Sequence, residues 1–160
     1  MLDPILKSAI EIADRHASIL STALDDLSQW PPLSAELLSH DDTQLLRILD
    51  QIQSRFTKLQ DHLGTRLFPA LLDALAEDPR LPMIDRLNLL EKLGYIESAD
   101  TWHDLRAVRN RLAHDYPSAP ELLAAEVQQA VDAARAILTL WSGMKARILA
   151  HPVLRTLVSD

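Results

Sequence analysis

The sequence predicts an all-α fold, an up-and-down bundle of about four to five helices. The 160 residues include only 3 glycines, and Leu, Ala, Asp, Glu, Gln and Arg dominate the composition, which favours helix over strand. Two long segments also repeat apolar residues at alternating steps of four and three, the spacing of helices that pack side by side. We expect roughly antiparallel neighbours and a two-fold homodimer.

The length predicts a single domain over residues 1–160, with a core large enough to fold without cross-links. Zero cysteines exclude disulfides, thiolate zinc sites and thiol nucleophiles. The N-terminus lacks the pattern of a signal peptide and no apolar run is long enough to cross a membrane, so a cytoplasmic protein without membrane contacts is expected. The formal net charge of -7 argues against a broad nucleic-acid-binding face, since binding phosphates needs clustered Lys and Arg.

The first half of the chain predicts two long helices. Asp3 and Pro4 are typical of a helix start, and the first helix should run to about Ser28, before Trp30 and two prolines. A connector with a short helical turn at 35–38 leads to the second helix, which begins near Asp41 or Asp42. Its seam consists of Leu45, Leu49, Ile52, Phe56, Leu59 and Leu63. A bend or restart is expected between Gly64 and Pro69, with burial continuing towards Asp78 and Pro79.

The second half predicts three further helices. A short one over 83–93 should end at Gly94, and the next should span about 98–114, capped by Ser98 or Asp100 and stopped by Pro117. Ser118 to Glu121 has the spacing of a capping box for the fifth helix. That helix carries the second seam, formed by Leu123, Val127, Ala130, Ala134, Ile137, Trp141, Met144 and Ile148. The tail over 151–160 has no evident partner and is expected to fray.

The stretch from Leu105 to Tyr116 concentrates the polar chemistry of the chain, with three arginines, an amide, an imidazole and a phenol at a helix end. Arg109 should lie near the core edge, where it needs an anionic partner such as Asp100 or Asp104. His114 lies about 140° further round the same helix. A straight helix therefore does not bring the two onto one small substrate, but an isologous dimer could surround one cleft with both pairs.

Arginine and histidine together suit a phosphodiester. A guanidinium binds phosphate oxygens in pairs and stabilises developing charge, and an imidazole exchanges protons near neutral pH. These groups suffice for RNA cleavage by attack of the neighbouring 2′-OH, without a metal. His103 and His114 lack the spacing of zinc ligands, so we expect neither metal nor cofactor.

The pattern Arg109-x4-His114-x-Tyr116 resembles the HEPN superfamily and, within it, the HepT-like toxins that are paired with a minimal nucleotidyltransferase (MNT) antitoxin. Asn110 matches the polar residue that often follows the arginine. The similarity in architecture covers about residues 40–148, and the motif covers only 109–116.

The resemblance implies a cytoplasmic toxin of a toxin-antitoxin pair, a homodimeric, metal-independent endoribonuclease. Arg109 and His114 would be its catalytic pair, and Asn110 would orient the substrate or His114. Tyr116 would be the hydroxyl that the nucleotidyltransferase antitoxin modifies with adenylate. Arg106 and Arg111 lie outside the family pattern and are expected to help hold RNA.

Two other interpretations remain open at this level. The chain could be a non-catalytic, substrate-binding-like companion subunit of a nucleotidyltransferase, in which the motif binds a nucleotide or phosphate without cleaving it. It could also be a helical dimerisation domain with an accidental motif. In that case Arg109 is an ordinary ion-pair residue, His114 a favourable residue at a helix C-terminus, and Tyr116 a packed phenol.

Overall fold

The computed structural model describes residues 4–113 and 119–158, in which all regular structure is helical. The elements are α1 (Pro4–Leu27), α2 (Ala35–Ser39), α3 (Thr43–His62), the π-helix η1 (Leu63–Leu67), α4 (Phe68–Ala74), α5 (Met83–Lys92), α6 (Ala99–Leu112), α7 (Pro120–Ala150) and α8 (Leu154–Val158). The predicted all-α bundle is confirmed.

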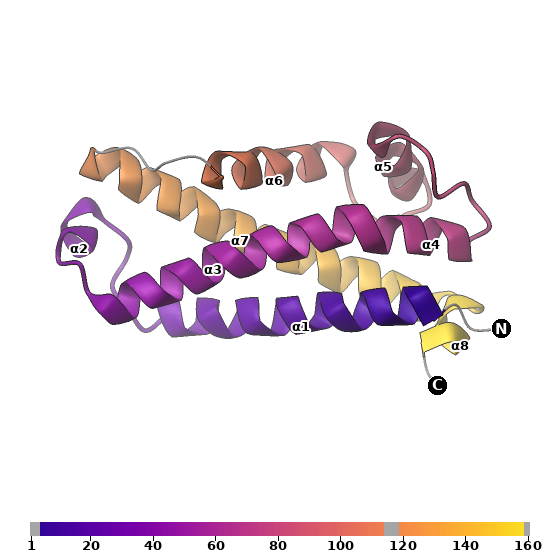
Figure 1. Ribbon diagram of the computed structural model, residues 1–160, viewed down its shortest axis with the longest axis horizontal. Coiled ribbons are helices and arrows are strands. Elements are labelled where there is room, and N and C mark those ends of the chain that lie inside the picture. The colour runs from indigo at the N-terminus through magenta and orange to yellow at the C-terminus, as the bar shows by residue number, and fades with distance from the viewer. Residues whose placement is uncertain (1–3, 114–118, 159–160) are drawn as a thin grey trace.

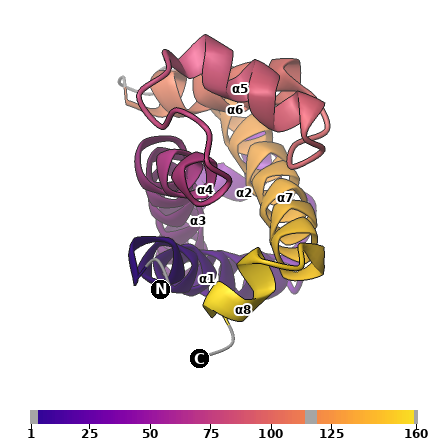
Figure 2. The same ribbon diagram turned by 90° about the vertical axis from the view of Figure 1, so that its right-hand side faces the viewer.

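Four helices, α1, α3, α6 and α7, surround the core (Figure 1). Viewed along the bundle, α1 lies at the bottom, α3 and α7 at the two sides, and α5 and α6 at the top (Figure 2). α7 contacts α1, α3 and α6, and α3 contacts α1 and α6. α3 thus packs against α1 on one side, against α6 on the other and against α7 on its inner face. One long strip of α3 is left facing solvent.

The two predicted seams form most of this core. Leu45, Ile52, Phe56, Leu59 and Leu63 of the first seam are at most 1% exposed, and Leu49 packs against them at the edge. The start of α3 is fixed by Asp42, whose Oδ1 accepts the backbone N–H groups of Gln44 and Leu45. On the second seam, the residues from Ala130 to Ile148 are buried, whereas Leu123 and Val127 are partly buried.

The irregularity predicted between Gly64 and Pro69 is a π-helical turn. In a regular helix the Pro69 ring would clash with the carbonyl of Thr65, four residues earlier. The chain instead widens over η1, and the N–H of Phe68 donates to the carbonyl of Leu63, five residues back. α3 therefore continues into α4 without a break (Figure 1). Within the widened turn, Gly64 faces Trp102 of α6 and Met83 of α5.

The remaining helix ends follow the sequence closely. Gly94 has φ +78° as the residue that ends α5, and the Ser98 hydroxyl caps α6 by accepting the N–H of Asp100. α7 begins at Pro120, and Ala119 is the residue before it, one position later than the predicted capping box requires. The proposed cap Ser118 lies outside the described residues.

The C-terminal tail differs from expectation. Instead of fraying, residues Leu154–Val158 form α8, which packs against α1 and α7. Leu154 is fully buried in the core, so its apolar side chain anchors the segment. No helix within residues 4–113 and 119–158 has the length and apolarity to cross a membrane.

Candidate functional site

A cavity of about 230 Å³ lies where α6 passes α3, η1 and the start of α5. Arg106, Arg109 and Asn110 of α6 all line it. The other lining residues are Gln60, Asp61, Gly64, Thr65, Met83 and Trp102. Three of the residues singled out from the sequence thus share one small, mostly polar recess.

Arg109 is held in this recess by an ion pair with Asp61 of α3. Its Nε donates to Oδ1 at 3.0 Å and its Nη2 donates to Oδ2 at 2.9 Å, a bidentate arrangement. The side chains of Arg109 and Asp61 are 31% and 46% exposed. The expected anionic partner therefore exists, but the prediction of Asp100 or Asp104 was wrong, because α3 and not α6 supplies the carboxylate.

The ion pair leaves part of the guanidinium available. The hydrogen bonds that Asp61 accepts, together with its charge, raise the pKa of Arg109 above its usual value. Arginine has five N–H donors, and Asp61 takes one on Nε and one on Nη2. Among the described residues, both Nη1 protons and the second Nη2 proton remain. One proton on each Nη forms the end-on pair that binds two oxygens of a phosphate.

The end of α6 is tied to α3 independently of Arg109. The side-chain amide of Gln53 donates to the carbonyl of Leu112 at 3.3 Å, and Ala113 is the C-cap. This bond fixes the point at which the chain leaves α6. His114 and Tyr116 follow directly and lie outside the described residues.

Arg111 lies apart from this recess. Its Nη2 donates to the side-chain carbonyl of Gln129 on α7 at 2.9 Å, in a groove that Asp104 also lines. The structure thus brings Arg106, Arg109 and Asn110 together and places Arg111 on the α7 side of the helix.

Trp102 forms the inner wall of the cavity. It is fully buried, stacks at a tilt on Phe68 with ring centroids 4.7 Å apart, and leaves its indole Nε1–H without a partner among the described residues. A Cβ built on Gly64 would lie only 3.0 Å from Trp102 Cζ2. The absence of a side chain at Gly64 therefore allows η1 to approach the indole closely.

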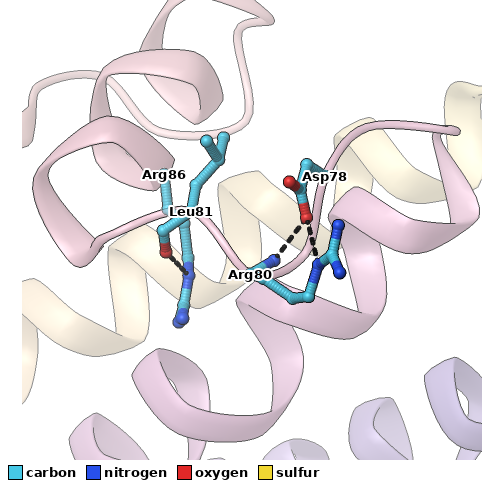
Figure 3. A network of polar contacts seen from close by, with 4 residues as sticks. All are labelled: Asp78, Arg80, Leu81 and Arg86. Carbon is cyan, nitrogen blue, oxygen red and sulfur yellow. Dashed lines mark hydrogen bonds and ion pairs between the residues drawn. The ribbon is translucent and has the colours of Figure 1, made fainter.

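The loop between α4 and α5 carries a network of polar contacts that leads to the start of α5 (Figure 3). Asp78 Oδ1 accepts both the backbone N–H and the Nε–H of Arg80, at 2.9 and 3.1 Å. Arg86 Nε donates to the carbonyl of Leu81 at 2.6 Å, and its Nη1 reaches the carbonyl of Gly64 at 3.5 Å. These bonds hold the start of α5, and with it Met83, against η1.

Sequence reasoning missed the contribution of α3 and η1 to the site. Asp61, Gln60 and Thr65 line the cavity, yet they stand between seam positions and match no motif. The one local signal was the Gly64 and Pro69 interruption, because widened helical turns occur frequently at functional sites.

Comparison with models of known families, with curated proteins and with solved structures found no match. Among the described residues no three His, Asp or Glu side chains come together in a group able to hold a metal ion.

Proposed function

We propose that this protein is a HEPN-type, metal-independent endoribonuclease, the toxin of a toxin-antitoxin pair. The active unit is a homodimer in the cytoplasm. Its partner is an MNT-type nucleotidyltransferase antitoxin that modifies Tyr116. The observation that carries the proposal is the motif Arg109-x4-His114-x-Tyr116, whose arginine lines a polar recess with Asn110 and Arg106.

In this proposal the chain's own residues perform a transesterification. The O2′–P bond forms as the 2′-OH loses its proton to His114, and the P–O5′ bond breaks as the 5′ oxygen gains a proton from the second imidazole of the dimer. The products are a 2′,3′-cyclic phosphate and a free 5′-OH. The end-on face of Arg109 binds the phosphate oxygens and stabilises their growing charge.

Asp61 supports this role for Arg109 through orientation. A guanidinium that donates two hydrogen bonds to one carboxylate has lost most of its rotational freedom before the substrate binds. Less conformational entropy is therefore lost when it binds phosphate. Asn110 and Arg106 lie in the same recess and can contact the adjacent nucleotide.

A companion subunit of a nucleotidyltransferase is the second candidate, and the same ion pair favours it. Asp61 neutralises part of the charge of Arg109, and the chain is acidic overall, which weakens attraction for RNA. In this case the recess binds a nucleotide or phosphate without cleaving it.

The decisive experiment incubates the purified chain with total RNA in EDTA, beside Arg109→Ala and His114→Ala. Arg135→Ala is the control, because Arg135 is an exposed arginine on α7 whose ion pair is with Asp132. Circular dichroism confirms that each variant is folded. Cleavage by the parent and by Arg135→Ala, but not by Arg109→Ala or His114→Ala, supports the nuclease. Mass spectrometry of the purified parent must show that Tyr116 carries no adenylate, because the proposed modification would silence the nuclease.

Absence of cleavage by an unmodified parent contradicts the nuclease. If that parent still binds a nucleotide and loses binding in Arg109→Ala, the companion subunit becomes the better assignment. If neither activity nor binding responds to Arg109 or His114, the motif has no functional role.

A further inference from the structure

A second group of basic side chains lies between α1 and α3. His16 and the exposed Arg15 come from α1, and Arg55, Lys58 and His62 come from α3. The rings of His16 and His62 meet edge to face, with centroids 6.2 Å apart. We call these five residues the α1–α3 basic cluster. Its bases come from two helices whose spacing is fixed by the core, so the cluster is held in place by the fold.

Two hydrogen bonds define the state of the histidines. Arg55 Nη1 lies 3.0 Å from His16 Nδ1, and since a guanidinium only donates, Nδ1 accepts and the proton of neutral His16 is on Nε2. His62 Nε2 lies 2.8 Å from the carbonyl of Ala9 and donates to it. The Nε2–H of His16 makes no hydrogen bond among the described residues, so it can donate to a bound anion.

Arg55 has no carboxylate partner among the described residues. The basic partners of the ion pairs among these residues are Arg80, Arg109, Arg135 and Lys145. The Nε–H of Arg55 is buried and has no acceptor among the described residues, although Arg55 as a whole is half-buried. A guanidinium that is partly desolvated and faces a histidine instead of an acid costs free energy unless an anion joins it.

The charged groups that shift the pKa of His16 are all basic. Burial and then the charges of Arg55, His62, Lys58 and Arg15 lower the pKa of His16, and no acidic group contributes. In a chain with net charge -7, a local surplus of bases is unusual and attracts anions.

We propose that the α1–α3 basic cluster binds a phosphate group, and that this phosphate belongs to the same RNA strand whose scissile phosphate sits at Arg109. The choice of RNA rests on the proposed function, whereas phosphate binding by the cluster does not. Arg55 and His16 supply the recessed donors, and Lys58 supplies an exposed charge.

The position of the cluster on α3 supports a shared strand. Asp61, which holds Arg109, and His62 of the cluster are consecutive residues that contact α6 and α1, respectively. The two sites are thus separated by the solvent-facing strip of one helix, about 10 Å in diameter. A single strand of a few nucleotides spans that width.

The test measures binding of a fluorescein-labelled single-stranded RNA to full-length His114→Ala protein at several KCl concentrations. Arg55→Gln and Lys58→Gln are added separately, with Arg135→Gln as the matched charge control. The slope of log association constant against log salt concentration is negative, and losing one phosphate contact reduces its magnitude by about 0.7. This corresponds to about a fivefold loss of affinity at about 0.1 M salt. We expect this loss for both cluster variants and none for the control. Lys58 is exposed, so its variant tests the proposal even if Arg55→Gln is poorly folded.

Two competitors separate the possible sources of phosphate. Inorganic phosphate at constant ionic strength should displace RNA only weakly, and vesicles of phosphatidylserine should not bind more tightly to the parent than to Lys58→Gln. Unchanged affinity and slope in both cluster variants would overturn the proposal. Binding that depends on the cluster for inorganic phosphate or vesicles but not for RNA would overturn the assignment to RNA.

The outcomes also distinguish this proposal from the proposed function. RNA binding that depends on Arg55 and Lys58, in a chain that never cleaves RNA, supports the cluster and contradicts the nuclease. Cleavage that is independent of both residues supports the nuclease and contradicts the cluster.

Discussion

Asp61 and Arg109 meet through two parallel hydrogen bonds of 3.0 and 2.9 Å, one from Nε and one from Nη2. The pair joins the middle of the bundle to the end of α6, at the residue on which the proposed chemistry depends. Asp61 has two opposing effects on a phosphate at Arg109. It fixes the direction of the guanidinium, and it repels the incoming anion.

Asp61→Asn separates these effects. The substitution removes the charge and one of the two acceptors, so Arg109 becomes less ordered while the recess becomes more positive. In the RNA cleavage assay, we expect kcat to fall about tenfold and KM to fall as well. Because the pair is partly exposed, the free energy of unfolding should change by no more than about 1 kcal/mol.

Asp104→Asn is the matched control for Asp61→Asn. Asp104 is an exposed acid on α6 that lines the groove towards α7, so it changes the net charge equally without touching Arg109. A rise in kcat for Asp61→Asn would show that repulsion, and not orientation, is the main effect of Asp61.

The helices were predictable because their signals are local. Asp42 and Ser98 cap their helices, and Gly94 ends one at positive φ. The partner of Arg109 was not predictable, since Asp61 lies 48 residues away in the chain and nothing in the spacing of either residue connects them. Leu154 gave no signal either: the tail is too short to show a helical period, and Leu154 becomes a core residue only because α1 and α7 leave room for it.

Gly64→Ala should destabilise the protein by about 1–2 kcal/mol. The new Cβ would lie 3.0 Å from Trp102 Cζ2 and 3.4 Å from Met83 Cε, and the fully buried indole has little room to move. Urea unfolding measures the loss.

Gly143→Ala provides the comparison for Gly64→Ala. Gly143 lies inside α7 with no atom within 4 Å of the added Cβ, so the better helix propensity of alanine should stabilise by about 0.5–1 kcal/mol. Equal effects at both glycines would contradict the close packing between η1 and Trp102.

Asp14 links α1 to α7 by accepting two hydrogen bonds, from Trp141 Nε1 at 3.0 Å and from Lys145 Nζ at 2.6 Å. Trp141 is 3% exposed, so Asp14→Ala leaves an indole N–H with little access to water. We expect a loss of about 1–2 kcal/mol in thermal unfolding. Asp14→Asn retains an acceptor for the indole and should lose about half as much. Equal losses would assign the stabilisation to the Lys145 ion pair alone.

His16 should make the protein less stable in mild acid. Its pKa in the folded state is held below 6.5, first by burial and then by the charge of Arg55. Well above pH 6.5 the ring is neutral in both states and its protonation does not affect stability. As the pH falls below 6.5, the unfolded chain binds a proton that the folded chain does not, so the free energy of unfolding decreases until the folded-state pKa is reached.

His16→Gln retains a side-chain oxygen for Arg55 and lacks this titration. Urea unfolding from about pH 7.5 to about pH 5.5 should therefore give a flatter stability profile for His16→Gln than for the parent. The exposed His40 provides the control, and a profile for His40→Gln as flat as that for His16→Gln would show that the effect does not come from the α1–α3 basic cluster.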